Sequence, residues 1–217
     1  MNTTRRGFLT SLALGLLAAP ALLRAATDHG AEGPYSTLAK PLPTAVPGKI
    51  EVIEFLWYGC PHCAKVEPFV EAWAKKLPPD VAFRREHIVW DARPETLAHA
   101  RAFITLRSLG LIERHQQAMF DAVQKERIDF RNERAVFDWA GKRGIDRAKF
   151  EAMYKSFGMQ SQLARLQSLT STYRIDGVPT FIVNGKYSTE PHRAGGERQV
   201  LEVVDGLVER ERAAAKR

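Results

Sequence analysis

Hydrophobic and polar positions along this chain form two kinds of pattern, which change near residues 91 and 172. Apolar, β-branched and aromatic residues form a run over residues 50–58, and a mixed alternating pattern covers residues 81–89. Short apolar runs bounded by turn formers are typical of buried strands. From about residue 91 to residue 172 the apolar residues recur at helical spacing instead, and the strand pattern then returns. We therefore expect an α/β protein with an all-helical block between two strand units.

The helical block divides at its capping and helix-breaking residues. Pro94 suits the first turn of a helix, and Asn132 and Asp146 are of the types that commonly cap helix N-termini. These residues and the intervening glycines predict five helices, at residues 94–110, 111–125, 133–144, 147–158 and 160–173. Further on, Asn184-Gly185 lies between two short strand-like runs and predicts a β-hairpin. A last helix follows, with apolar residues on one face from Val200 to Val208.

The first strand leads directly into the motif Cys60-Pro61-His62-Cys63. Pro61 suits the first helical position because its missing N–H costs nothing there, so a helix over residues 61–76 begins with Cys60 at or near its N-cap. Unpaired N–H groups and partial positive charge favour a thiolate at that position, and His62 adds a further partner. Cys63 lies one turn deeper on the same face. We expect a lowered pKa for Cys60, which would make the disulfide a strong oxidant by stabilising its reduced form.

Three other interpretations of the two cysteines compete with a redox pair. A structural disulfide of this span closes a very small loop and stabilises the fold by only about 2 kcal/mol on the loop-entropy argument. A structural zinc site usually needs four ligands, and the sequence has no second C-x-x-C and no H-x-x-x-H pair. Two inert buried thiols fit less well with the strand-turn-helix placement and the flanking Pro and His. We therefore expect no metal site and favour a redox-active disulfide.

Three further stretches fit the same pattern as the motif. These are Tyr35–Pro41, which has the form of an N-terminal strand and turn, Gly177–Thr180, which contains Val-Pro-Thr, and the hairpin Phe181–Tyr187. Together with Cys-Pro-His-Cys they resemble the DsbA family of the thioredoxin superfamily. The resemblance covers nearly all of the chain after about residue 34. It implies a thioredoxin-like fold with an inserted all-helical domain.

The resemblance also implies roles for residues outside the motif. It implies a cis Val178–Pro179 bond beside the cysteines, with the backbone of Val178 free to pair with a substrate strand. Glu54 matches the family's buried acid and would modulate the cysteines, with a raised pKa from burial; the alternative is a carboxylate that faces a loop or forms a salt bridge. Arg85 stands in for a lysine of the enteric relatives. Gly59 departs from the bulky aromatic residue often seen before the first cysteine.

The first 26 residues have the character of an export signal. Arg5 and Arg6 form a basic start, Leu12–Leu23 is an apolar stretch, and small residues follow at Ala25 and Ala26. The stretch around the paired arginines also resembles a twin-arginine signal. Removal of residues 1–26, which carry three arginines and no acid, lowers the formal charge from +7 to +4. With charges of both signs interspersed along the rest, we expect no nucleic-acid binding.

These observations predict an exported thiol:disulfide oxidoreductase. We expect a signal peptide at 1–26, a thioredoxin-like domain formed by 27–90 and 173–217, and a helical insertion at 91–172. By resemblance, the protein acts as a periplasmic monomer without a cofactor. It donates the Cys60–Cys63 disulfide to unfolded exported proteins with free thiols and is reoxidised by a membrane quinone-linked oxidase of the DsbB type. Two alternatives stay open: a periplasmic disulfide isomerase or reductase, and a peptide-binding chaperone with a vestigial redox site.

Overall fold

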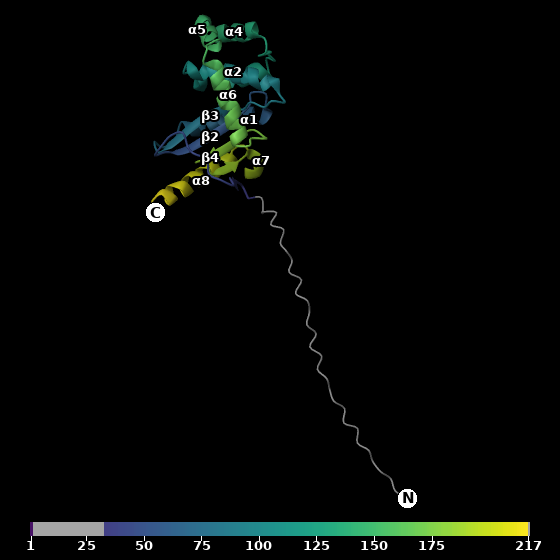
Figure 1. The fold of residues 1–217 in the computed structure, drawn as a ribbon, viewed down its shortest axis with the longest axis vertical. Coiled ribbons are helices and arrows are strands. Elements are labelled where there is room, and N and C mark those ends of the chain that lie inside the picture. The colour runs from purple at the N-terminus through teal and green to yellow at the C-terminus, as the bar shows by residue number, and fades with distance from the viewer. Residues whose placement is uncertain (2–32, 217) are drawn as a thin grey trace. The chain divides into compact units, whose positions relative to one another are not determined.

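A five-stranded mixed sheet lies at the centre of the described part of the chain. The computed structural model describes Met1 and residues 33–216 (Figure 1). The expected signal peptide lies outside these residues except for Met1, so its prediction is not tested. The strand order is β1-β5-β4-β2-β3. The strands are β1 (Ser36–Thr37), β2 (Ile50–Leu56), β3 (Val81–His87), β4 (Thr180–Val183) and β5 (Tyr187–Thr189).

Strand β2 is the strand that delivers the cysteine motif, and it is buried along its length. It pairs in parallel with β3 and antiparallel with β4, so Glu54 lies opposite both Arg85 and Phe181. The strand ends at Leu56, two residues earlier than the apolar run predicts. The reason is a turn, in which the Trp57 carbonyl accepts a hydrogen bond from the Cys60 N–H at 2.9 Å. The chain therefore turns directly from the sheet into the helix that follows.

Two helices cover one face of the sheet. Helix α1 (Pro61–Ala74) connects β2 to β3, and α8 (Gln199–Ala215) follows the hairpin and the short α7 (Pro191–Ala194). Apolar side chains of α1 and α8 pack with Val52 and Phe181 in one buried cluster. Alternate residues of β2, such as Phe55, belong to another cluster. Because successive side chains of β2 point to opposite faces of the sheet, the strand contributes to two separate hydrophobic cores.

The helical block forms the largest buried cluster. It comprises α2 (Pro94–Ser108), α3 (Ile112–Gln124), α4 (Glu133–Lys142), α5 (Arg147–Tyr154) and α6 (Met159–Thr172) (Figure 1). Helix α2 packs against α5 and α6, and α4 packs against α5. The same cluster contains Phe103, Phe150, Tyr58 and Cys63. The core of the insertion is therefore continuous with the redox motif, and residues 33–216 pack as one compact unit.

Most of the predicted helix boundaries agree with the structure. Asn132 and Asp146 are the N-caps of α4 and α5, and each side chain accepts a backbone N–H bond three residues on. The fourth predicted helix is too long, because α5 ends at Tyr154 and Gly158 caps the start of α6 instead. The sequence analysis also missed α7. The division of the chain at residues 90/91 and 172/173 stays a prediction.

The core of the insertion offers a matched stability test. Phe150 is 0% exposed whereas Phe157, seven residues later, is 103% exposed. We expect Phe150→Ala to lower the free energy of unfolding by about 3–5 kcal/mol, because it leaves a cavity. Phe157→Ala should change it by less than about 0.5 kcal/mol. Urea denaturation of both variants checks this, and equal effects would contradict the placement of Phe150 in the core.

Candidate active site

The two cysteines lie at the point where the sheet gives way to α1. Cys60 is the N-cap residue of α1, with extended backbone angles and no side-chain cap hydrogen bond, and Pro61 is the first helical residue. Cys60 is 8% exposed and Cys63 is 0% exposed. Both are free thiols in this structure. Cys60 therefore keeps a small exposed fraction, whereas Cys63 has none.

The pKa values of the two thiols are shifted in opposite directions. The pKa of Cys60 is lowered from 9.0 to about 6, first by a hydrogen bond with the Cys63 side chain and then by the backbone N–H groups of Cys63 and His62, with a small contribution from the charge of His62. Burial raises the pKa of Cys63 well above its ordinary value. At neutral pH the reduced pair therefore carries its negative charge on Cys60, at the start of the helix.

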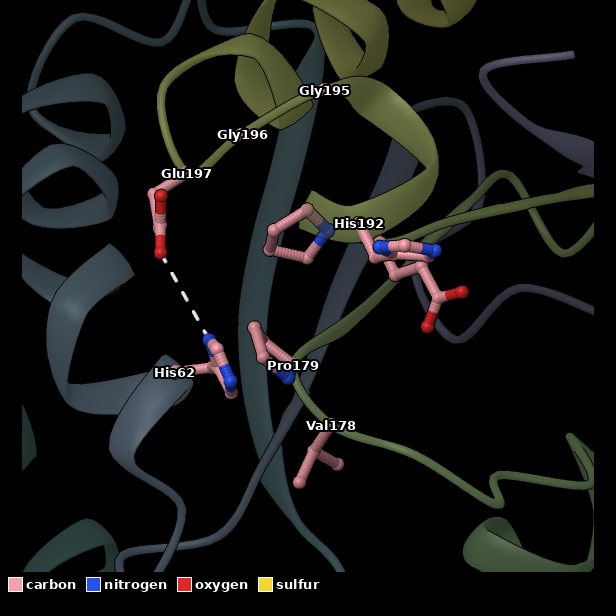
Figure 2. A pocket seen from close by; sticks show the side chains of 9 residues that line it. His62, Val178, Pro179, His192, Gly195, Gly196 and Glu197 are labelled. Atoms are coloured by element: carbon pink, nitrogen blue, oxygen red, sulfur yellow. Dashed lines mark ion pairs between the residues drawn. The ribbon is translucent and has the colours of Figure 1, made fainter.

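His62 lies beside the pair but points toward solvent. Its side chain is 66% exposed, and its Nδ1 atom lies 3.9 Å from the Glu197 carboxylate (Figure 2). A contact between two such groups in water contributes little to stability. His62 can therefore act on Cys60 mainly through its backbone N–H and, when protonated, through its charge.

The loop before β4 closes the site from the other side. The Val178–Pro179 bond is cis, as expected. The Val178 carbonyl oxygen lies 3.2 Å from the Cys60 sulfur, which donates to it as a thiol. Beside this contact is a hollow of about 550 Å³ lined by His62, Pro179 and Glu197 among others (Figure 2). The structure thus brings Cys60, Val178 and Pro179 together, as the resemblance implies, next to a concavity.

A buried charged cluster lies behind the cysteines. Glu54 is 0% exposed, and Arg85 Nε lies 3.3 Å from its Oε2 atom. Arg85 also contacts Glu67 at 2.9 Å and Glu113 at 2.8 Å. Burial first, and then the charge of Glu67, raise the pKa of Glu54 to about 8. Burial likewise raises the pKa of Glu67 to about 7. The buried Arg85 is therefore the shared ion-pair partner of two buried acids. The two acids, Glu54 and Glu67, together retain a proton near neutral pH.

The structure corrects and extends the predicted site. Of three aromatic residues near the motif, Tyr58 and Phe181 are fully buried, whereas Trp57 is partly exposed. The sequence analysis missed Glu67, although its position four residues after Cys63 places it on the same helix face and was a usable signal. It also missed Gln116, whose amide contacts the Glu67 carboxylate at 3.3 Å and which no motif marks.

Gly59 permits a close contact that its sequence position alone does not indicate. A Cβ atom built on Gly59 would lie 2.3 Å from the indole ring of Trp57. Real Cβ atoms do not approach other atoms that closely, so any larger residue at position 59 requires Trp57 to move. The Trp57 indole occupies the space that a side chain at position 59 would take.

Within residues 33–216 no three His, Cys, Asp or Glu side chains gather closely enough to hold a metal ion. None of the helices in that part of the chain has both the length and the apolar character that a bilayer crossing needs.

Comparisons with known proteins agree with this geometry. The DSBA-like thioredoxin domain family matches residues 51–200. The thiol:disulfide interchange protein DsbA of Pseudomonas aeruginosa is 39% identical over 196 residues, 88% of this chain and 90% of that protein. The protein of the same name from Pseudomonas syringae pv. tomato is 42% identical over 188 residues, 84% of each chain.

Solved structures show the same relationship. The crystal structure of Pseudomonas aeruginosa DsbA superposes with a TM-score of 0.82 at 39% identity, covering 88% of this chain and 99% of that one. NmDsbA1 from Neisseria meningitidis gives a TM-score of 0.76 at 34% identity, covering 85% and 95%. The thioredoxin-like fold with its helical insertion and C-x-x-C pair defines a thiol:disulfide oxidoreductase of oxidative protein folding. Within that class, the chain belongs to the DsbA family.

The lowered pKa of Cys60 gives a direct test of the site. In the reduced protein, thiolate absorbance should rise with a midpoint near pH 6. Because the folded-state pKa is below the unfolded one, the reduced fold gains stability as pH rises from about 6 and loses it as pH falls. His62→Ser should raise the midpoint by about one unit or less, because it removes a nearby charge. A wild-type midpoint at or above 8.5, the ordinary value for a cysteine, would contradict the thiolate assignment.

The buried acids predict a pH dependence of the opposite sign, which the oxidised protein isolates because its cysteines do not titrate. A carboxyl whose pKa is raised to about 8 in the fold destabilises the fold when it ionises. We expect the free energy of unfolding to fall between about pH 6.5 and 8, by a few kcal/mol in order of magnitude. Below about pH 6.5 the buried His87 and His99, whose pKa values burial lowers, contribute the opposite slope. Glu54→Gln should remove most of that decline. Glu71→Gln, on the exposed side of α1, is the control and should leave the decline unchanged.

Proposed function

We propose that this protein is the oxidant in disulfide transfer to newly exported proteins, with Cys60 as the sulfur that exchanges with the client. The observation that supports this most is the difference between the two thiols: the pKa of Cys60 is lowered to about 6, whereas that of Cys63 is raised. A stabilised Cys60 thiolate stabilises the reduced protein and so makes its disulfide a stronger oxidant.

The proposed reaction runs in two exchanges. A client thiolate attacks the Cys60 sulfur, the Cys60–Cys63 bond breaks, and Cys63 leaves with the electron pair and takes up a proton, as its raised pKa favours. A second client thiolate then attacks the client sulfur of the mixed disulfide, and Cys60 leaves as a thiolate. Because a low pKa improves a leaving group, this second step favours release of an oxidised client. Two electrons pass from the client to the protein.

Residues around the pair take supporting roles in this proposal. Pro61 and His62 form the helix start that holds the Cys60 thiolate. Val178 and Pro179 form the edge at which an extended client segment binds, a mode that tolerates many sequences because main-chain hydrogen bonds dominate it. Glu54 modulates the pair, since its ionised form raises the pKa of Cys63.

The cellular setting is part of the same proposal. The export-like residues 1–26 and the use of only two cysteines, both in the motif, support action in an oxidising compartment, the periplasm. Membership of the DsbA family supports a membrane quinone-linked oxidase of the DsbB type as the partner that restores the Cys60–Cys63 disulfide. We propose that the protein acts on its clients as a monomer.

Stoichiometric transfer to a reduced client tests the proposed direction. The oxidised mature protein, mixed with a reduced unfolded protein and no other oxidant, should form about one client disulfide per molecule, and its glutathione equilibrium should lie strongly toward the reduced form. The variant with both Cys60→Ala and Cys63→Ala should transfer none. Net reduction of an oxidised client by the reduced protein would favour a reductase instead. Suppression of client aggregation by the double variant, without transfer by the wild type, would favour a chaperone.

A further inference from the structure

The turn that carries the first cysteine, residues 57–60, is held by a side chain from the helical insertion. Gln124, at the end of α3, places its Nε2 atom 2.8 Å from the Tyr58 carbonyl oxygen and 3.0 Å from the Cys60 carbonyl oxygen. An amide nitrogen has two hydrogens and a carbonyl oxygen only accepts, so the nitrogen of Gln124 faces the turn and donates both bonds. These two bonds join residues that are more than 60 positions apart in the chain.

The Cys60 carbonyl links this turn to the first turn of α1, so a hydrogen bond to it affects both. It belongs to the peptide that joins the N-cap residue to Pro61, and it accepts the Ala64 N–H at 3.2 Å, within the first turn of α1. After the hydrogen bond with the Cys63 side chain, which is the largest cause, the N–H groups of Cys63 and His62 in that same turn lower the pKa of Cys60 further. Since Cys60 makes no side-chain cap of its own, the helix start depends on contacts from outside the helix.

A second side chain of the insertion holds the other end of the turn. The Trp57 indole N–H donates to Nδ1 of His99, on α2, at 2.9 Å. His99 is buried, and burial lowers its pKa to about 4, so near neutral pH the ring has the free nitrogen that this bond needs. The Trp57 carbonyl in turn accepts a hydrogen bond from the Cys60 N–H.

We propose that Gln124 and His99 are positioning residues of the redox reaction, through which the helical insertion fixes the turn that stabilises the Cys60 thiolate. Their contacts are to the Trp57 indole and to backbone carbonyls, so each acts through the turn that it holds and not on a sulfur atom directly. When the hydrogen bonds of either side chain are removed, the turn is less rigid and the N–H groups at the start of α1 are less well oriented toward the Cys60 sulfur. The pKa of Cys60 then rises and the disulfide becomes a weaker oxidant. The proposal rests on the Cys60–Cys63 redox pair, not on the direction of transfer to clients.

The first experiment compares two glutamines of α3. Gln124→Met removes the donor and keeps the length of the side chain, whereas Gln117→Met changes an exposed glutamine that bonds to Asp121 on the same helix. For each, thiolate absorbance is titrated and the glutathione equilibrium constant is measured. Gln124→Met should raise the Cys60 midpoint and shift the equilibrium about threefold to tenfold toward the oxidised protein, in line with the loss of hydrogen bonds to the turn. Gln117→Met should change neither.

The second experiment uses His99 and does not depend on the folding of the first variant. His99→Gln keeps an acceptor for the Trp57 indole, and His99→Leu removes it. We expect the redox shift in His99→Leu and its rescue, at least in part, in His99→Gln. If Gln124→Met or His99→Leu lowers the melting temperature but leaves the thiolate midpoint and glutathione equilibrium at wild-type values, the residues only stabilise the fold and the proposal is overturned. If the variants show the expected redox shift but the wild-type protein reduces its client instead of oxidising it, only the oxidant role is overturned.

Discussion

The interaction on which the rest of this site depends is the one between the N–H groups at the N-terminus of α1 and the Cys60 sulfur. A helix start offers N–H groups that have no partner within the helix, and here they face a sulfur rather than a hydroxyl or carboxylate cap. Pro61 fits this arrangement because it removes the one N–H that would have no acceptor there. The reactive residue is thus also the N-cap residue of its helix, so the charge state of its sulfur and the conformation of the first turn are linked.

Burial separates the roles of two chemically identical side chains. Cys63 is one turn deeper, within the core that the insertion shares with Tyr58, and its thiolate is costly there. Arg85 offsets part of the negative charge that Glu54 and Glu67 would bring behind it. Because arginine does not release its proton near neutral pH, any change of charge in this cluster has to come from the two acids. Proton exchange beside Cys63 is therefore confined to carboxyl groups.

The sequence was sufficient for features that depend on near neighbours. The caps Asn132 and Asp146, the hairpin turn at Asn184-Gly185 and the helix start at Pro61 all depend on residues within four positions of one another. The contacts of Gln124 and His99 could not be found in that way. Their partners lie 42 to 66 positions away, and a glutamine or a histidine in an amphipathic helix gives no local sign of such a contact. The resemblance to a family placed Val178 and Glu54, which the spacing of the residues alone did not.

Gly59 shows how a departure from a family pattern can have a counterpart in the same chain. The family often has a bulky aromatic residue there, but in this protein the indole of Trp57 lies over the glycine, only 2.3 Å from where a Cβ would be. Trp57 is also partly exposed and lies beneath the guanidinium of Arg93, 5.3 Å from the ring centre. The aromatic surface beside Cys60 is thus supplied by a residue two positions earlier. A residue larger than glycine does not fit at position 59 while the Trp57 ring lies there. The sizes of the residues at positions 57 and 59 therefore depend on each other.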